Sequence, residues 1–308
     1  MTVHSAYAVS VNNVMFSAIQ RQSVAPESTV VAETRAGSPY PRSVTINAQR
    51  NTATASTEDI VAALAAIGVE GEKIVTAQGV KFFQLILDDE TGLPASGSVH
   101  RALHIVRGKV VPNRLTVEHQ GDAMLEFTTH ALWNPAEAAN DPIQILASQA
   151  LPTGLAGGDR WTIAKAEVAG ETLNCSLSFQ IDFGVTITTE GCNSDIYDRS
   201  LRSSEIKPRI TIRGKDIAKF LAAAIPLKGK AATHANTILW LRKRVQGEAA
   251  FDADNAETHV KITAAGMAHW TSVHEADGNN RIESTLQIDC KHDGTNHPIV
   301  LLTGQAMT

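Results

Sequence analysis

The strict alternation of apolar and polar residues from Leu173 to Ile187 constrains the fold of this chain more than any other feature. Every odd position in the stretch is apolar and no even position is. Because side chains of a β-strand point alternately to its two faces, the pattern predicts one long strand with a buried and a wet face, and Cys175 falls on the buried one. The apolar positions of 161–168 and the turn at 169–171 extend this prediction to a long hairpin.

The side chains on the wet face of this predicted strand are small and mostly neutral. It carries one acid and neither Lys nor Arg. Two interpretations stay open: an ordinary antiparallel sheet with one hydrated face, and the wall of a water-filled lumen. The residues that we assign to this face are Asn174, Ser176, Ser178, Gln180, Asp182 and Thr186.

Length and charge narrow the class of protein. At 308 residues the chain exceeds the usual size of one domain, so two domains are expected. A formal charge of −5 argues against nonspecific clamping of nucleic acid, which needs clustered Lys and Arg. The one dense basic cluster, 242–244, is interpreted as a solvated strand end or a contact between subunits. Without a membrane-spanning apolar run or a secretory signal, we expect synthesis and folding in the cytoplasm.

The chain contains an internal repeat. Asp59–Ile67 is echoed by Asp216–Ile225, and Asp141-Pro142-Ile143 is echoed by His297-Pro298-Ile299. A third echo joins 41–46 to 208–212. The common order predicts a tandem duplication, with domains at residues 1–152 and 153–308 joined by a Pro- and Gly-rich linker. Chance similarity between two unrelated β-rich domains is the alternative.

Each predicted copy has the same elements in the same order. Copy one has a hairpin around Asn12-Asn13, a polar loop from Ala25 to Arg42, a strand at 44–48 and a helix capped by Thr57 and ended by Gly68. Copy two has the long hairpin, a polar loop at 190–205 and a helix starting at Asp216. The further strands are predicted at 81–87, 103–111, 114–118, 124–132, 237–241, 259–264, 268–273 and 281–290. The fold class is therefore mainly β with one short helix per domain (α+β), as two tandem β-sandwich or barrel domains.

The sequence contains no recognisable catalytic motif. The closest histidine pairs are 100/104, 269/274 and 292/297, and none has the HExxH spacing or nearby Cys ligands of a zinc site. The three cysteines at 175, 192 and 290 are expected to be reduced thiols. We expect no enzyme activity, no metal and no cofactor, with a His-dependent metalloenzyme as a remote alternative. The two polar loops are candidates for contact with another subunit, or else disordered loops.

This order of hairpin, charged loop, strand, short helix and further strands, written twice, resembles the tail tube proteins of long-tailed bacteriophages. The resemblance implies a virion tail protein, assembled in the host cytoplasm without membrane insertion, whose rings stack on one another and bind other tail proteins. Its partner is itself, in a trimeric ring with pseudo-sixfold symmetry, and DNA passes through the lumen without specific binding. The wet face of 173–187 would line this lumen.

The resemblance also assigns a role to the two polar loops, which would stack one ring on the next. The residues that carry this expectation are Glu27, Glu33, Arg35, Arg42, Asp195, Asp198, Arg199 and Arg202. One departure is that the first hairpin is shorter and less regular than the second. A distal-tail or tail-tip ring protein of the same fold is one alternative function, and a monomeric binding module of two β-sandwiches is another.

Overall fold

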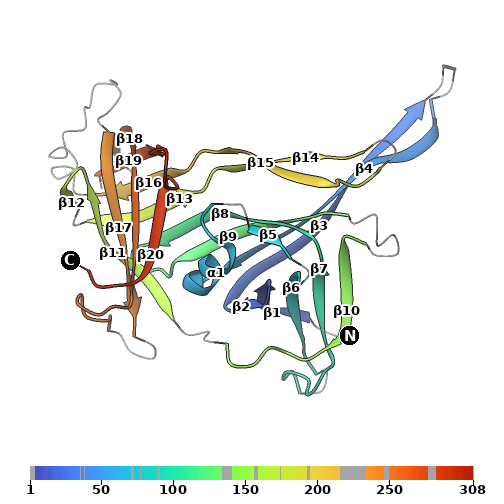
Figure 1. Ribbon diagram of the computed structural model, residues 1–308, viewed down its shortest axis with the longest axis horizontal. Coiled ribbons are helices and arrows are strands. Elements are labelled where there is room, and N and C mark those ends of the chain that lie inside the picture. Colours follow the sequence, from blue (N-terminus) through green and yellow to red (C-terminus); the bar gives the residue numbers. More distant parts are fainter. Residues whose placement is uncertain are drawn as a thin grey trace.

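The computed structural model describes residues 4–34, 36–37, 39–70, 73–76, 78–88, 91–133, 141–155, 159–173, 175–192, 195–215, 234–245, 250–276 and 282–307. Over these ranges the chain is mainly antiparallel β, as predicted, with one helix, α1 (Ile60–Ile67) (Figure 1). The strands up to residue 149 are β1 (His4–Val11), β2 (Val14–Phe16), β3 (Ile19–Thr34), β4 (Pro41–Thr57), β5 (Lys73–Val75), β6 (Val80–Ile86), β7 (His100–Ile105), β8 (Gly108–Glu118), β9 (Met124–Ala131) and β10 (Ile143–Gln149). The later strands are β11 (Arg160–Val168), β12 (Glu171–Leu173), β13 (Ser176–Asp182), β14 (Val185–Glu190), β15 (Ser200–Ile206), β16 (Arg209–Gly214), β17 (His234–Arg244), β18 (His259–Ala276), β19 (Ile282–Cys290) and β20 (Ile299–Gln305).

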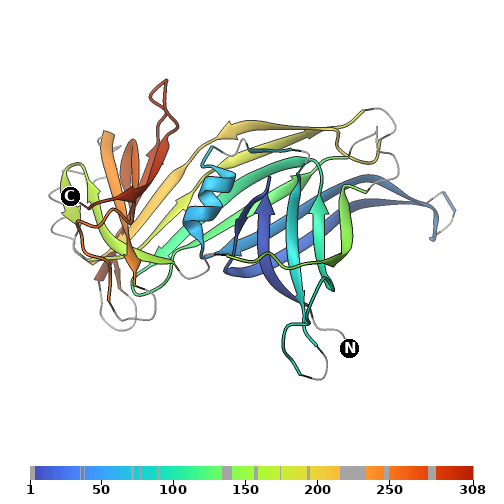
Figure 2. The ribbon, with the colours of Figure 1, turned by 60° about the horizontal axis from the view of Figure 1, so that its bottom comes forward.

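The first half of the chain forms two sheets with α1 beside them (Figure 2). One sheet has the order β10-β7-β6-β1-β2, and the other is the row β3-β4-β9-β8. The predicted hairpin at Asn12-Asn13 is confirmed: both residues have positive φ, and Val11 pairs with Val14. Two positive-φ residues between antiparallel strands match the right-handed twist of the strands they join, which favours this tight turn.

The second half pairs its strands in the same order as the first. The row β20-β18-β17-β11-β12 repeats β10-β7-β6-β1-β2, and the row β13-β16-β19-β18 repeats β3-β4-β9-β8. One difference in the described residues is that β18 runs without a break through both rows, where the first half uses two strands, β7 and β8. The two rows of the second half are therefore parts of one continuous sheet.

The registers repeat as well as the order. Ser23 pairs with Thr54; Gln180, 157 positions after Ser23, pairs with Thr211, 157 positions after Thr54. At this offset Pro208 corresponds to residue 51, so the expected echo between 41–46 and 208–212 is wrong. The true counterpart of Tyr40-Pro41-Arg42-Ser43 is Tyr197-Asp198-Arg199-Ser200.

The long strand predicted at Leu173–Ile187 is three strands, β12, β13 and β14, so the long hairpin with it is wrong beyond the turn at 169–170. The register of β13 shifts between Ser176 and Ser178, and such a bulge moves the residues before it to the other face. Gly184, with φ of +61°, separates β13 from β14, and a Cβ there would lie 2.0 Å from the carbonyl oxygen of Lys207. Cys175 is exposed rather than on a buried face.

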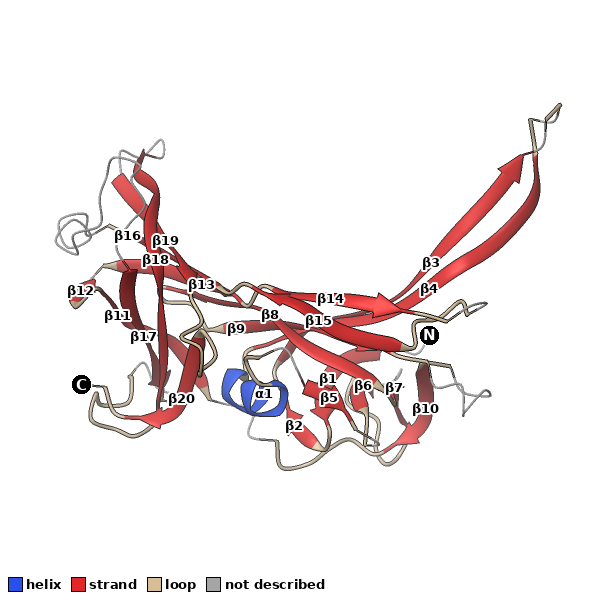
Figure 3. Cartoon of the chain, turned by 45° about the horizontal axis from the view of Figure 1, so that its top comes forward, coloured by secondary structure: helices blue, strands red, loops and turns tan. Residues whose placement is uncertain are grey.

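Both predicted polar loops are hairpins. We call Ser28–Gln49, the outer part of β3 and β4, the first arm, and Val185–Ile206, which contains β14 and β15, the second arm. The first arm projects away from the molecule, whereas the second runs back along it (Figure 3). Two strand boundaries were also misplaced: β8 begins at Gly108, and 259–276 is one strand rather than two.

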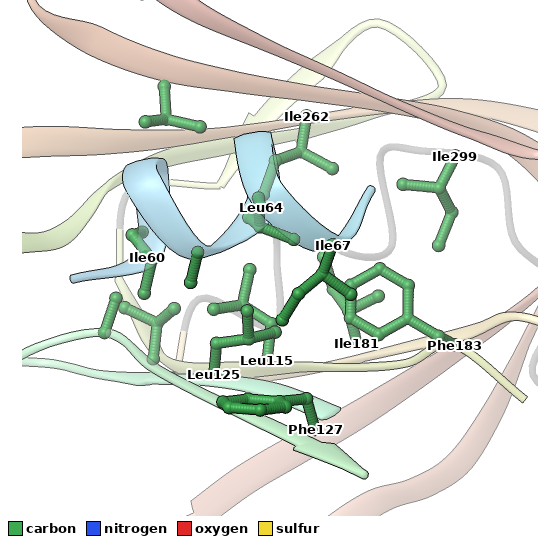
Figure 4. Packing of buried hydrophobic residues seen from close by; sticks show 14 of the residues in the cluster. Ile60, Leu64, Ile67, Leu115, Leu125, Phe127, Ile181, Phe183, Ile262 and Ile299 are labelled. Atoms are coloured by element: carbon green, nitrogen blue, oxygen red, sulfur yellow. The ribbon is translucent and has the colours of Figure 1, made fainter. Parts of the chain in front are cut away.

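The core lies between the sheets and joins both halves. Ile60, Leu64 and Ile67 of α1 point into it and pack over β8 and β9, while β13, β18 and β20 contribute from the second half (Figure 4). The helix ends at Gly68 as predicted, but it starts at Ile60, after Glu58 and Asp59, so no acid lies in its first turn. Thr57 Oγ1 accepts a hydrogen bond from Asp59 N at 3.0 Å, just ahead of the helix. The helix predicted from Asp216 lies outside the described residues.

Candidate assembly interface

The two halves meet edge to edge. Strand β8, the last of the row in the first half, pairs with β13, the first of the row in the second half. Asp182 lies opposite Arg114 and Ser178 lies opposite Glu118. The result is one continuous row of strands, β3-β4-β9-β8-β13-β16-β19-β18.

This junction is apolar on its core side. Phe179 and Ile181 of β13 and Leu115 and Val117 of β8 are all buried. Deleting such a side chain from a packed core costs about 2–5 kcal/mol, so the junction is a permanent part of the fold.

The other side of the junction is polar and charged. Arg114 Nε donates to Asp182 Oδ1 at 2.9 Å, and Arg209 Nε donates to Asp289 Oδ1 at 2.9 Å. Arg213 is paired with Glu283. The expectation of a face without Lys or Arg holds for the strand alone, because β8 and β16 bring arginines beside it. Each of these arginines has a carboxylate partner, so the face is mixed in sign and compensated.

Three of the predicted wet-face residues do share this face: Ser178, Gln180 and Asp182 are partly exposed, and Gln180 Nε2 donates to Asp182 Oδ2 at 2.9 Å. Ser176 was predicted wrongly, because it is buried at 8 % exposure, on the far side of the register shift. Thr186 is exposed but belongs to the second arm, beyond Gly184. Asn174 lies outside the described residues.

A seam of charges holds the halves together beside the sheet. Arg244 Nη1 lies 3.0 Å from Asp122 Oδ1, and Arg160 is paired with Glu58. Within the basic cluster at 242–244, Arg244 belongs to this seam through Asp122, whereas Arg242 and Lys243 pair with Asp254 and Asp159 of the second half.

The second arm lies against the first half of its own chain. Near its tip, the ring of Tyr197 lies 5.9 Å from that of Trp133, and the guanidinium of Arg199 lies 5.4 Å over the same indole. Gln49 N donates to the carbonyl oxygen of Ile196 at 2.6 Å. Further along the arm, the buried Lys109 donates from Nζ to Ser203 Oγ at 2.5 Å. These contacts fix the arm across β8 and the base of β4.

The predicted ring-stacking residues of the second arm have partners within the chain. Asp198 pairs with Arg50 at 3.4 Å, and Asp195 accepts a hydrogen bond from Arg199 Nη2 at 2.7 Å. That hydrogen bond raises the pKa of Arg199. Arg202 is exposed on β15. Glu33 and Arg42 of the first arm are exposed, as is Glu27, which directly precedes the arm, and Arg35 lies outside the described residues. A role of these eight residues in stacking stays a prediction.

Two strand edges of the row are open in the described part of the chain. Strand β3 pairs only with β4, and residues 268–276 of β18 pair only with β19. These are the counterparts of the two edges that meet in the junction: β3 corresponds to β13, and 268–276 corresponds to the part of β8 that faces β13. An open pair of backbone edges is a template for pairing with another chain.

Sequence reasoning missed Trp133, Lys109 and the open edge of β18. The repeated Tyr-x-Arg-Ser at 40–43 and 197–200 was the available signal for the arm tips, and it was hidden by the misaligned echo at 41 and 208. Among the described residues, no group of three or more His, Cys, Asp or Glu side chains could hold a metal ion, and no helix is long and apolar enough to cross a membrane.

Comparison with known proteins does not assign this interface. No model of a known protein family matches the chain, and no curated protein sequence matches it.

Proposed function

We propose that this protein is a structural protein that assembles head to tail with copies of itself into a ring, and that stacked rings form the DNA-conducting tube of a bacteriophage tail. The observation that carries the proposal is the β8–β13 junction, which joins two equivalent rows of strands and leaves the same two edges open at the ends. Pairing β18 of one copy with β3 of the next would repeat that junction and remove both open edges.

The internal junction implies a register for the proposed external one. Ala25 is the counterpart of Asp182, and Ser272 is the counterpart of Arg114, because Ala25 pairs with Thr52 as Asp182 pairs with Arg209, and Ser272 pairs with Thr285 as Arg114 pairs with Glu126. Ala25 of one copy would therefore lie opposite Ser272 of its neighbour, and Val24 would lie opposite Val273.

The size of the ring suits a conduit. Each chain supplies the eight strands of the row, so the trimer implied by the resemblance gives a closed sheet of about 24 strands. At a spacing of about 4.8 Å and a tilt of about 40°, its backbone diameter is roughly 48 Å. Barrels of about 16–18 strands already leave an aqueous channel, so this one would be open.

The wall chemistry suits passage without binding. An arginine that neutralises a phosphate releases counterions and creates a binding site on the wall. Here the arginines of the polar face, Arg114, Arg209 and Arg213, are paired with carboxylates of the same sheet. They would lose those partners by turning toward DNA, which lowers the net gain of a phosphate contact.

The test uses charges at one predicted pair. Ala25→Asp with Ser272→Asp places two carboxylates opposite each other, which disfavours strand pairing, whereas Ala25→Asp with Ser272→Arg copies the Asp182–Arg114 pair. We expect the first variant to need about tenfold more protein for half assembly and the second to assemble at least as well as wild type. Light scattering gives the mass, and negative-stain electron microscopy shows the particles.

The outcomes separate the alternatives. Tubes of stacked rings support a tail tube, and single closed rings that do not stack favour a distal-tail or tail-tip ring. A monomer of 32.9 kDa at high concentration, unaffected by either variant, would overturn the proposal and favour a binding module.

A further inference from the structure

The two arms have matching faces in different surroundings. In the first arm Val30 pairs with Ile46, and the same face continues with Val44, so an apolar strip runs along one side. These side chains are 56 %, 48 % and 62 % exposed. In the second arm the corresponding positions are Ile187, Ser203 and Leu201, and all three are half-buried.

The arm tips differ in the same way. Tyr197 is half-buried and lies against Trp133, whereas its counterpart Tyr40 is 75 % exposed. The following arginines, Arg199 and Arg42, repeat this difference. The second arm thus lies against a surface of its own chain, whereas the apolar strip and the tip of the first arm are exposed in a single chain.

The surface that would cover the first arm is the second-half counterpart of the one beneath the second arm. Lys109 pairs with residue 130 of β9, and Met267 pairs with the corresponding residue 289 of β19, so Met267 stands where Lys109 does. Leu132 N donates to the carbonyl oxygen of Arg107, and Lys291 N donates to that of Ala265. The residue after each donor is therefore equivalent, which places His292 where Trp133 stands.

We propose that the first arm lies across the second half of a neighbouring copy of this chain, with Ile46 against Met267 and Tyr40 against His292. The proposal rests on the proposed head-to-tail assembly and adds a second contact to its edge pairing. Both Ile46 and Met267 are large apolar side chains, 48 % and 40 % exposed, so the external contact would be apolar where the internal one is the polar pair Lys109–Ser203. The residues differ in step between the two contacts: the small polar Ser203 faces Lys109 in the internal contact, and the apolar Ile46 would face Met267 in the external one.

The tip contact gains an ion pair from the same turn. Asp293 follows His292, and backbone N–H groups of Thr295 and Asn296 each donate to its Oδ1 at 2.7 Å. The hydrogen bond from the Asn296 side chain, together with these backbone bonds, lowers the pKa of Asp293 to about 2, so Asp293 stays an anion. In the second arm Arg199 has a carboxylate in its own arm, Asp195, but the matching position in the first arm, two residues before Tyr40, is a serine in the sequence. Asp293 of the neighbour would supply the carboxylate for Arg42.

Two variants of the full chain test the proposal by replacing the apolar external contact with the polar pair of the internal one. Met267→Lys places an ammonium against Ile46 of the neighbour, and we expect about tenfold more protein to be needed for half assembly, measured by light scattering. Met267→Lys with Ile46→Ser recreates the internal Lys109–Ser203 pair across the interface, so assembly should return to near the wild-type concentration. An unchanged midpoint for the single variant, or no rescue by the second substitution, would overturn the arm placement.

Crosslinking separates this inference from the proposed function. In a chain with the exposed Cys175 and Cys192 changed to Ser, burial raises the pKa of the remaining Cys290 thiol to about 12 and keeps it unreactive. A disulfide between Val24→Cys and Val273→Cys reports edge pairing between copies. A short bismaleimide between Tyr40→Cys and His292→Cys reports the arm tip.

Both double variants should give covalent oligomers on a denaturing gel. Edge links without tip links would reject the arm placement and leave the ring intact, whereas the absence of both would reject the ring as well. Trp133→Cys with Tyr197→Cys is the matched control, because those residues face each other within one chain and should crosslink without forming oligomers.

Discussion

Strands β13 and β3 hold the same position in the two halves, yet one edge is sealed and the other is open. The core-side residues of β13 at the junction are Phe179 and Ile181, both buried, whereas their counterparts in β3 are Gln22 and Val24, both half-buried. Backbone pairing is the same in register, so the difference lies in side chains. The comparison teaches that the same strand framework can end in a sealed edge or in an open one, and that the two edges differ in the apolar volume at two positions.

The largest expected effect comes from emptying the sealed junction. Phe179→Ala removes a buried ring and should lower the free energy of unfolding of the monomer by about 3–5 kcal/mol, measured by urea denaturation. Gln22→Ala, the matched change at the open edge, should alter it by less than about 1 kcal/mol. Equal losses at both positions would mean that the two edges do not differ in the way described.

The next largest effect on stability should come from two equivalent glycines, one in each half, and should be the same for both. A Cβ at Gly108 would lie 2.0 Å from the carbonyl oxygen of His130, and one at Gly266 would lie 2.2 Å from that of Asp289. Each Gly→Ala change forces backbone to move, so we expect a loss of about 1–3 kcal/mol in the free energy of unfolding for either variant. Gly191→Ala, where the nearest atom is 3.5 Å away, is the control and should be nearly neutral. A large effect at only one of the two sites would break the equivalence of the halves.

A smaller effect belongs to the charged seam, which the open edge lacks. Asp122→Ala removes the partner of Arg244 and weakens the pairing around Arg160, both partly exposed, so the free energy of unfolding should fall by about 1 kcal/mol. Asp254→Ala breaks a more exposed pair with Arg242 that lies within the second half, and should cost only a few tenths of a kcal/mol. The ranking of the two variants in urea denaturation decides whether the seam joins the halves.

The smallest expected effect is on the pH dependence of stability, to which His130 contributes in the first half. Burial, assisted by Arg50 and opposed by Glu27 and Asp198, lowers the pKa of His130, whose counterpart in β19 is Asp289. The unfolded chain therefore binds more protons than the folded one below the ordinary His pKa of about 6.5, and stability falls as pH drops through that range. His130→Gln should reduce the stability lost between pH 7.5 and 5.5 in urea denaturation. An unchanged slope would contradict the assigned cause.

The sequence was sufficient for the short-range features of the fold. The positive-φ turn at Asn12-Asn13 and the end of the helix at Gly68 follow from local backbone preferences, and both are present. The alternation at 173–187 was real but misleading, because a bulge at Ser176–Ser178 and the left-handed Gly184 interrupt pairing without interrupting the pattern. The polar arms were predicted as loops because few of their side chains are buried. Their strands are held by backbone hydrogen bonds between β3 and β4 and between β14 and β15, which need no apolar pattern in the sequence.

Less of the candidate interface could be predicted from the sequence. Ser178, Gln180 and Asp182 could be placed on one face from periodicity alone, since only local alternation is needed. The arginines beside them could not, because pairing of β13 with β8 and β16 joins residues that are distant in sequence. The contacts of Trp133 and Lys109 with the second arm likewise depend on how the halves meet, which no local pattern specifies.

The joining of β8 to β13 inside one chain has a consequence for the arithmetic of assembly. Each chain carries two strand rows locked in sequence, so any closed ring built from it contains an even number of rows. Half of the junctions in that ring form during the folding of single chains, where dilution has no influence. The other half form between chains, so a ring of three chains has three intermolecular junctions where six separate rows would have six.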